Sequence, residues 1–419
     1  MKQVRKLLFL AAILVLLVGI ASASDVSDDA ATTTKINGAT GAAQSTQTVS
    51  QTETPVHEVK IGNKLSDKCQ DITGSENTTK NIDKKNIKET NVKEDSKTAT
   101  SWDDLNYTVQ SAREDTTITL DEGSVWTAKY TITWDHNHVI TIDGKGQTIN
   151  GNRTQLFYIK EGSLILKNIT IINANDSNGG AISNNGTVTI INSTLSNNTA
   201  TRGGAIYNHE GGTVIIINST LSNNTATVRV NEDGGGAIYN HGGNVTITNS
   251  TLINNNATGR VNQDGGGAIY NYEGNISITN STLSNNNAYH RGGAVFNYEG
   301  GTVTITNSTL SNNNANRRGG AVFNYGGGTV TITNSTLSNN TARGSGSGPY
   351  GGGAIFNSYG TVIITNSSSL SNNTATSNGL TDGGGAIYNY EGAVIITNSS
   401  TLSNNNAKHY GGAIYNYGG

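Results

Sequence analysis

The chain has 419 residues, of which 52 are glycine and only 14% are charged, and its formal net charge is −3. That charge excludes a globally basic protein that binds nucleic acid. The single cysteine, Cys69, excludes an intrachain disulfide, so an exported form of this chain must be stabilised by a repetitive core.

The first hundred residues lie outside the predicted fold. A basic segment, Lys2 to Lys6, precedes an apolar run from Leu7 to Ile20, and Ala21-Ser22-Ala23 follows. This order is typical of a secretory signal peptide over residues 1–23. A retained membrane anchor is the alternative, but the run is shorter than the ~20 residues that span a bilayer. Residues 24–100 are polar and lack periodicity, which predicts a disordered linker.

Residues 101–178 predict a cap and irregular entry coils. Trp102, Leu105 and Val109 follow helical spacing, and Ser101 with Asp104 resembles a capping box. A short amphipathic helix here would cover the open end of a stack of strands, as repeat arrays require. Short β-rich runs follow at Thr117–Leu120, Tyr130–Thr133, Val139–Ile142, Leu164–Leu166 and Ile169–Ile172.

The rest of the chain, residues 179–419, repeats one phrase. After a degenerate copy at Gly179, the motif Gly-Gly-Ala-Ile/Val-Tyr/Phe-Asn begins at Gly203, Gly235, Gly266, Gly292, Gly319, Gly352, Gly384 and Gly411. A second phrase, such as Thr-Val-Thr-Ile-Thr-Asn-Ser-Thr-Leu-Ser-Asn-Asn at 302–313, lies between copies. Nearly all variation in length falls after Asn-Asn-x-Ala, so we expect the insertions to form loops along one edge of a stack. The array stops at Gly419 within a repeat.

Each repeat holds three short β-compatible pieces separated by Gly or Asn. This pattern predicts an all-β fold, a right-handed parallel β-helix of about a dozen coils. Within residues 329–334, Val330, Ile332 and Asn334 point to one side of the strand and the threonines to the other. We therefore expect Asn334 and its equivalents to face inward and form a hydrogen-bonded ladder. The equivalents are Asn218, Asn249, Asn280 and Asn307, and a second ladder is expected at Asn208, Asn240, Asn271 and Asn297.

The phrases GGAIYN and TITNSTLSNN resemble the repeat of the polymorphic outer-membrane proteins of bacteria. They resemble still more closely the adhesin-like surface proteins of methanogenic archaea. The stretch from Val139 to Ile149 is similar to the entry coils of those proteins, and the resemblance covers residues 101–419. It implies a pectin-lyase-like right-handed β-helix with a secreted or cell-surface role in adhesion.

The variable corner after Asn-Asn-x-Ala collects the first candidate binding residues, which are basic. They are Arg202, Arg229, Arg260, Arg291, Arg317, Arg318, Arg343 and Lys408. The acidic residues of the same corner are Glu232, Asp233, Asp264 and Asp382. We predict a modestly basic ridge that binds an anionic polymer, such as an acidic cell-wall or host glycan. The alternative is that these mixed charges only keep the protein soluble.

An aromatic row is the second candidate. Strand alternation places it opposite the inward aliphatic residues, at Tyr207, Tyr239, Tyr270, Phe296, Phe323, Phe356, Tyr388 and Tyr415. Exposed rings could pack on sugar faces or on protein partners. The alternatives are stacking between adjacent coils for stability, or a row that faces inward.

The sequence also holds 21 Asn-x-Ser/Thr triplets, each a nominal acceptor for N-glycosylation in an exported protein. Because Asn218 and its equivalents are expected to face inward, the better acceptors are Asn77, Asn106, Asn175 and Asn256.

Catalysis is not indicated, because the acidic residues recur with the repeat and no metal, nucleotide or nucleophile motif is recognisable. The one non-repeated polar cluster, around His136 and His138 with Asp135 and Asp143, is expected to be a solvated turn. We therefore predict a non-enzymatic adhesin-like rod, without cofactor or metal, that binds glycans or surface proteins of another cell. The alternatives are a structural spacer of a longer surface protein, and a polysaccharide lyase or glycoside hydrolase, which the same fold also hosts.

Overall fold

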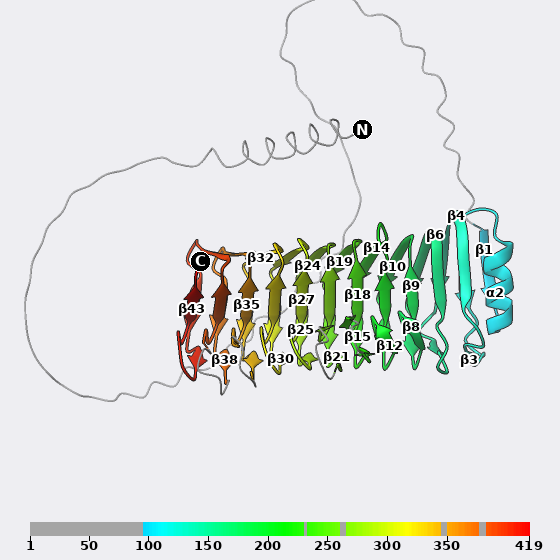
Figure 1. Ribbon diagram of the computed structural model, residues 1–419. Coiled ribbons are helices and arrows are strands. Elements are labelled where there is room, and N and C mark those ends of the chain that lie inside the picture. Colours follow the sequence, from blue (N-terminus) through cyan, green and yellow to red (C-terminus); the bar gives the residue numbers. More distant parts are fainter. Residues whose placement is uncertain (1–94, 230–232, 260–264, 345–349, 377–382) are drawn as a thin grey trace, which may run out of the picture. The chain divides into compact units, whose positions relative to one another are not determined.

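The computed structural model describes residues 95–419 except for the segments 230–232, 260–264, 345–349 and 377–382. This part of the chain is a parallel β-solenoid with one helix at its N-terminal end (Figure 1). The expected signal peptide, Cys69 and most of the expected linker lie outside the described residues. Strand β1 (Asp95–Ala99) lies inside the expected linker and pairs in parallel with β2 (Thr116–Leu120), so the fold begins earlier than predicted.

Each regular coil contributes four strands, and equivalent strands of successive coils pair in parallel and in register. The first strand comes from the GGAIYN phrase and the second from the TVTIT phrase, and both belong to one 21-stranded sheet. The first strands are β9 (Ile182–Asn184), β13 (Ile206–Asn208), β18 (Ile238–His241), β23 (Ile269–Tyr272), β27 (Val295–Tyr298), β31 (Val322–Tyr325), β35 (Ile355–Ser358), β39 (Ile387–Tyr390) and β43 (Ile414–Tyr417). The second strands are β10 (Thr187–Ile191), β14 (Thr213–Ile217), β19 (Asn244–Thr248), β24 (Asn275–Thr279), β28 (Thr302–Thr306), β32 (Thr329–Thr333), β36 (Thr361–Thr365) and β40 (Ala393–Ile396).

The third strands form an 11-stranded sheet with one strand from each coil, which approximately confirms the expected dozen coils. They are β3 (Trp126–Thr127), β5 (Thr148–Asn150), β7 (Thr170–Ile172), β11 (Thr194–Ser196), β15 (Thr220–Ser222), β20 (Thr251–Ile253), β25 (Thr282–Ser284), β29 (Thr309–Ser311), β33 (Thr336–Ser338), β37 (Ser369–Ser371) and β41 (Thr401–Ser403). The fourth strands are β8 (Asn175–Asn178), β12 (Thr199–Arg202), β16 (Thr225–Ala226), β21 (Asn256–Ala257), β26 (Asn287–Ala288), β30 (Asn314–Ala315), β34 (Thr341–Ala342), β38 (Thr374–Ala375) and β42 (Asn406–Ala407). A separate pair, β17 (Gly234–Gly235) with β22 (Gly265–Gly266), follows the fourth strand in two coils.

Apolar residues of the first three strands fill the interior. In one coil Val303, Ile305 and Leu310 are fully buried, and their equivalents in the neighbouring coils are buried too. Each such side chain stabilises the fold by about 1.5–3 kcal/mol through leaving water. The threonines between them are half-exposed, so the alternation predicted for the second strand is confirmed.

The inward-facing ladder predicted at Asn334 and its equivalents is wrong, although Nδ2 of Asn334 does donate to Oδ1 of the exposed Asn307 (2.9 Å). Strand β32 ends at Thr333, and Asn334 has a φ of 46°, so the chain turns there and the alternation stops. Asparagine tolerates this left-handed conformation better than most residues. Its side chain is exposed, and Ser335 is buried in its place. The same correction applies, with φ between 49° and 51°, to the exposed residues Asn218, Asn249, Asn280 and Asn307.

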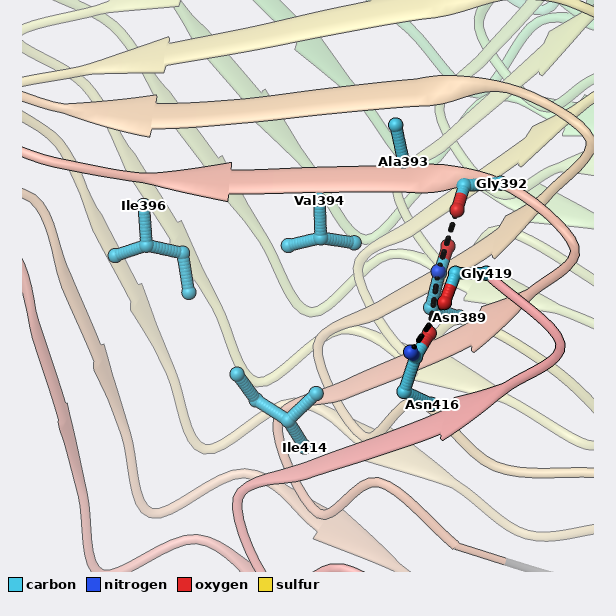
Figure 2. A pocket seen from close by; sticks show the side chains of 8 residues that line it. All are labelled: Asn389, Gly392, Ala393, Val394, Ile396, Ile414, Asn416 and Gly419. Carbon is cyan, nitrogen blue, oxygen red and sulfur yellow. Dashed lines mark hydrogen bonds between the residues drawn. The ribbon is translucent and has the colours of Figure 1, made fainter.

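One buried asparagine ladder lies at the end of the first strands. Nδ2 of Asn240 donates to Oδ1 of Asn271 (2.8 Å) and to the carbonyl oxygen of Gly243 (2.8 Å), which closes the turn before the second strand. This confirms the ladder expected at Asn208, Asn240, Asn271 and Asn297. It continues to Asn389 and Asn416, which line a hollow of about 500 Å³ on the uncovered end of the last coil (Figure 2).

A second buried ladder, which the sequence analysis did not predict, uses the last asparagine of each Ser-Asn-Asn. Oδ1 of Asn286 accepts hydrogen bonds from the backbone N–H (2.9 Å) and Nδ2 (3.0 Å) of Asn255. Its own Nδ2 donates to the carbonyl oxygen of Leu252 and to Oδ1 of Asn313, both at 3.0 Å. Every hydrogen-bonding group of this fully buried amide is therefore satisfied. The ladder comprises Asn198, Asn224, Asn255, Asn286, Asn313, Asn340, Asn373 and Asn405.

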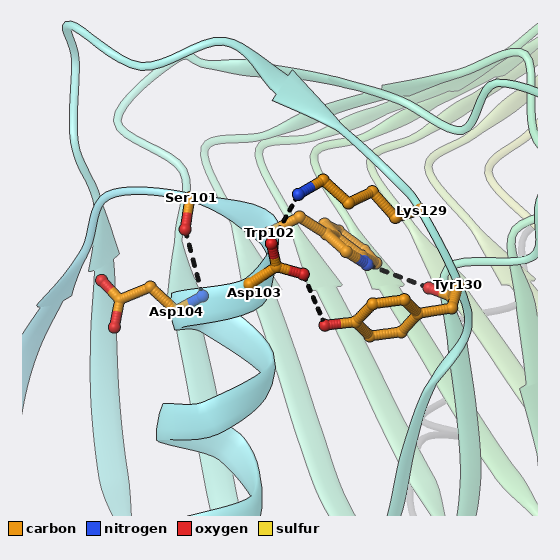
Figure 3. A network of polar contacts seen from close by, with 6 residues as sticks. All are labelled: Ser101, Trp102, Asp103, Asp104, Lys129 and Tyr130. Carbon is orange, nitrogen blue, oxygen red and sulfur yellow. Dashed lines mark hydrogen bonds and ion pairs between the residues drawn. The ribbon is translucent and has the colours of Figure 1, made fainter.

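The helix α2 (Trp102–Ser111) confirms the predicted cap. Oγ of Ser101 accepts a hydrogen bond from the N–H of Asp104 (3.1 Å), as an N-cap should. Asp103 binds Lys129, and the Tyr130 hydroxyl donates to its other oxygen at 2.8 Å (Figure 3). The pKa of the Asp103 carboxyl is lowered by these two partners. These contacts hold the helix on the first coils.

The entry coils are more regular than the predicted short runs. Strand β4 (Ile132–Asp143) joins two of those runs and pairs in parallel with β6 (Phe157–Lys167). The register shifts between Trp134 and Val139, where the extra residues bulge out of the sheet. Each of these long strands thus spans the positions of both first and second strands of a later coil.

We predict that Asn286→Ala destabilises the protein by about 3 kcal/mol, because buried amide and carbonyl groups in both neighbouring coils lose their hydrogen-bond partner. Asn280→Gly is the matched control in the same coil, since Asn280 is exposed and glycine adopts its φ of 50° readily. Urea denaturation of the two variants measures the difference. If the two variants lost the same free energy of unfolding, the buried ladder would not contribute specifically to stability.

Candidate binding surface

Basic side chains emerge at one edge of the solenoid, directly after the fourth strands. The N–H of Arg343 donates to the carbonyl oxygen of Ala315 (2.9 Å), and the N–H of Lys408 donates to that of Ala375 (3.2 Å). Both residues therefore occupy the same position of their coils. Arg343 and Lys408 are exposed, as is Arg229 on the corresponding segment of an earlier coil. The expected gathering of these three residues at one corner is thus present.

The other described basic residues of the corner are less exposed to solvent. Arg291 lies 5.4 Å from the ring centre of Phe323, and Arg318 lies 5.2 Å from that of Phe356. These two arginines pair in adjacent coils and cover aromatic rings by cation–π contacts. Arg202 and Arg317 are also half-buried. Of the remaining corner residues, Asp233 is described, whereas Arg260, Glu232, Asp264 and Asp382 lie outside the described residues.

The aromatic row points outward from the first strands but is buried, so the expectation of an exposed row is wrong. Tyr207 and Tyr239 are 6% and 7% exposed, and Tyr270 and Tyr388 are 1% exposed. Neighbouring ring centres along the row lie 4.6 to 5.4 Å apart. The rings pack on one another beneath the corner, which favours the stabilising alternative over direct contact with a sugar.

A second aromatic row, two residues after the buried row or three in the case of Tyr359, remains partly exposed. Its described members are Tyr272, Tyr298, Tyr325, Tyr359, Tyr390 and Tyr417, with neighbouring ring centres 5.3 to 6.3 Å apart. The sequence placed most of these tyrosines beside the buried row without giving them a role. Exposed carboxylates border them at Glu273, Glu299 and Glu391. The turns of these three coils therefore carry a negative charge, whereas exposed basic residues lie at the variable corner.

Tyrosine ionisation is disfavoured in this second row. Burial and a hydrogen bond to Glu299 raise the pKa of Tyr298 to about 12. A hydrogen bond to Tyr390, followed by burial, raises the pKa of Tyr359 to about 12. The hydroxyls consequently stay protonated and able to donate hydrogen bonds throughout the physiological range.

The non-repeated cluster lies on the bulged strand β4 rather than on the expected turn. Asp135 lies 3.6 Å from His136 and 3.7 Å from Lys160, in a half-exposed position. Asp143 is buried and instead binds Lys145 (3.2 Å) and Lys167 (3.8 Å). Within the described ranges, no group of three or more His, Cys, Asp or Glu residues is arranged to hold a metal ion.

We predict that stability falls between about pH 10 and pH 12. An unfolded tyrosine loses its proton near pH 10, whereas folded Tyr298 keeps it to about pH 12. With respect to Tyr298, the folded state then binds more protons than the unfolded state, so the contribution of Tyr298 to the free energy of unfolding decreases with rising pH in this window and is fully present below it. Denaturation midpoints should fall less steeply for Tyr298→Phe, while Tyr107→Phe, at a 72% exposed tyrosine of the helix, should leave the slope unchanged. Equal slopes for all three proteins would refute this assignment.

Comparison with known proteins agrees with the geometry of the coils. The Chlamydia polymorphic membrane protein repeat matches residues 192–209, 218–241, 367–390 and 399–417. A search of curated proteins found no significant match. No helix among the described residues is both long and apolar enough to cross a membrane. The closer likeness to archaeal adhesin-like proteins stays a prediction. The chain is thus a parallel β-solenoid, and part of its repeat array is similar to the Chlamydia polymorphic membrane protein repeat.

Proposed function

We propose that this chain is a non-catalytic, adhesin-like protein displayed outside the cell, and that its variable corner binds acidic glycans of another cell or of a cell wall. One observation carries the proposal. The parallel register brings exposed basic residues from distant parts of the sequence to one edge, where Arg343 and Lys408 hold equivalent positions. The surface character indicated by the repeat match supports the location.

The charges suit a long anionic polymer better than a small ligand. Arg229, Arg343 and Lys408 are exposed, and each contact with an anion in water contributes little by itself. Several contacts along one polymer add through the high effective concentration of the tethered groups. A row of like charges also attracts an anionic polymer over a distance, so binding should weaken as salt screens it.

The absence of catalysis is part of the proposal. The exposed glutamates Glu273, Glu299 and Glu391 recur at the same turn of their coils. A glycosidase instead needs two carboxylates with different roles around one sugar bond. Repetition along the solenoid favours repeated binding contacts over a single reaction centre.

The test is binding of the full chain to immobilised acidic and neutral glycans and to whole cells. We predict that replacing Arg229, Arg343 and Lys408 with glutamine lowers affinity for acidic glycans about tenfold, since three solvent-exposed ion contacts are lost. The matched control replaces Arg113, Lys145 and Lys160, which are exposed basic residues outside the corner and change the net charge equally.

Three results would contradict the proposal. Binding to no glycan or cell would favour the spacer, and equal losses in both triple variants would remove the corner as the site. Release of new reducing ends or unsaturated products from an acidic polysaccharide would show a lyase or hydrolase.

A further inference from the structure

In nine coils an asparagine at the corner between the second and third strands begins an N-glycosylation triplet. We call these residues the corner asparagines. They are Asn168, Asn192, Asn218, Asn249, Asn280, Asn307, Asn334, Asn366 and Asn398. Each is followed two residues later by serine or threonine, which is the pattern Asn-x-Ser/Thr.

The geometry of the corner presents these side chains to solvent. All nine have φ between 46° and 53°, and all except Asn168 are exposed. In the coil of Asn307, Ser308 is buried and Thr309 begins strand β29 in a half-exposed position. Nδ2 of Asn334 donates a hydrogen bond to the side-chain oxygen Oδ1 of Asn307 (2.9 Å), so this bond does not use Nδ2 of Asn307, the atom that would accept a glycan.

The buried asparagines differ from the corner asparagines in sequence as well as in place. Members of both ladders, such as Asn271 in Asn-Tyr-Glu and Asn286 in Asn-Asn-Ala, lack the triplet throughout. The array thus contains two separate sets of asparagines. The buried ones hydrogen-bond to each other, and the corner asparagines begin acceptor triplets.

A half-exposed position at the start of the fourth strand accepts either threonine or asparagine. Thr225, Asn256 and Asn287 occupy equivalent places on successive fourth strands. Threonine and asparagine therefore exchange at a half-exposed strand start without loss of register. After the corner asparagines, by contrast, the third residue of the triplet is a serine or threonine in all nine coils.

We propose that the corner asparagines are acceptors for N-linked glycans, forming a glycosylated edge along the solenoid. A bond forms between Nδ2 and the anomeric carbon of a lipid-phosphate-linked oligosaccharide donor. The bond from that carbon to the phosphate oxygen breaks, and the proton lost by the amide leaves with the lipid phosphate. The inference rests on the proposed export of the chain. It replaces the sequence-based preference for Asn77, Asn106, Asn175 and Asn256.

Crowding limits how many of these sites one molecule can carry. Neighbouring coils lie about 4.8 Å apart, which is less than the width of an oligosaccharide. Glycans on adjacent corner asparagines would therefore collide, and we expect each site to be modified in only a fraction of molecules.

The test is mass spectrometry of tryptic peptides from the full chain recovered from its own cells. Cleavage after Arg291 and Arg317 gives the peptide 292–317, whose single triplet begins at Asn307. We expect a fraction of this peptide to carry added sugar mass on Asn307. Asn307→Asp and Thr309→Ala should abolish that mass, while Thr309→Ser, which preserves the triplet, should retain it.

The outcomes separate this inference from the proposed function. Chain found at the cell surface with Asn307 and the other corner asparagines wholly unmodified overturns the inference and leaves surface display intact. Chain confined to the cell interior and unmodified overturns both. Sugar mass that survives Asn307→Asp but not Thr309→Ala would place the glycan on oxygen and overturn N-linkage.

Discussion

The fold depends on one constraint: a buried side-chain amide is satisfied only when the next coil places an identical amide above it. Asn286 accepts two hydrogen bonds from Asn255 and donates one to Asn313. A slip of one residue in any coil would break this chain and leave buried polar groups unpaired, at a cost of about 1–3 kcal/mol for each. The apolar core of Val, Ile and Leu drives collapse without fixing the register, because aliphatic contacts are not directional. The ladders therefore select the register.

Because the register is fixed, equivalent residues of successive repeats lie in rows along the surface. Residues far apart in the chain, such as Arg343 and Lys408, reach equivalent places, whereas the turn at Glu273, Glu299 and Glu391 forms an acidic side. Most of the variation in coil length falls at one corner, and a single extra residue such as Ser367 is accommodated between the second and third strands without a break in the ladder from Asn340 to Asn373. Loops at this corner can thus vary in length without disturbing the core.

Local pattern predicted the fold well and the surface less well. Alternation in residues 329–333 and the capping pair Ser101 and Asp104 are local signals, and both are confirmed. The prediction that Asn334 faces inward was wrong because the alternation was extended past the end of the strand into a left-handed turn. An asparagine recurs before Ser-Thr in successive repeats, and asparagine tolerates the left-handed conformation, so this pattern could have indicated the turn. For the aromatic row the sequence left exposure and stacking between coils both open, because the cover of the row comes from the corner of another coil, as Arg291 over Phe323 shows.

Hydrogen exchange of asparagine side-chain amides, followed by nuclear magnetic resonance, tests the ladders most directly. Amide protons of ladder residues such as Asn271 and Asn286 are buried and bonded to the next coil, so they should persist after transfer to heavy water. Those of exposed residues such as Asn249 and Asn280 should exchange at once. Rapid exchange of every asparagine side chain would contradict stacked, buried amides as the basis of this fold.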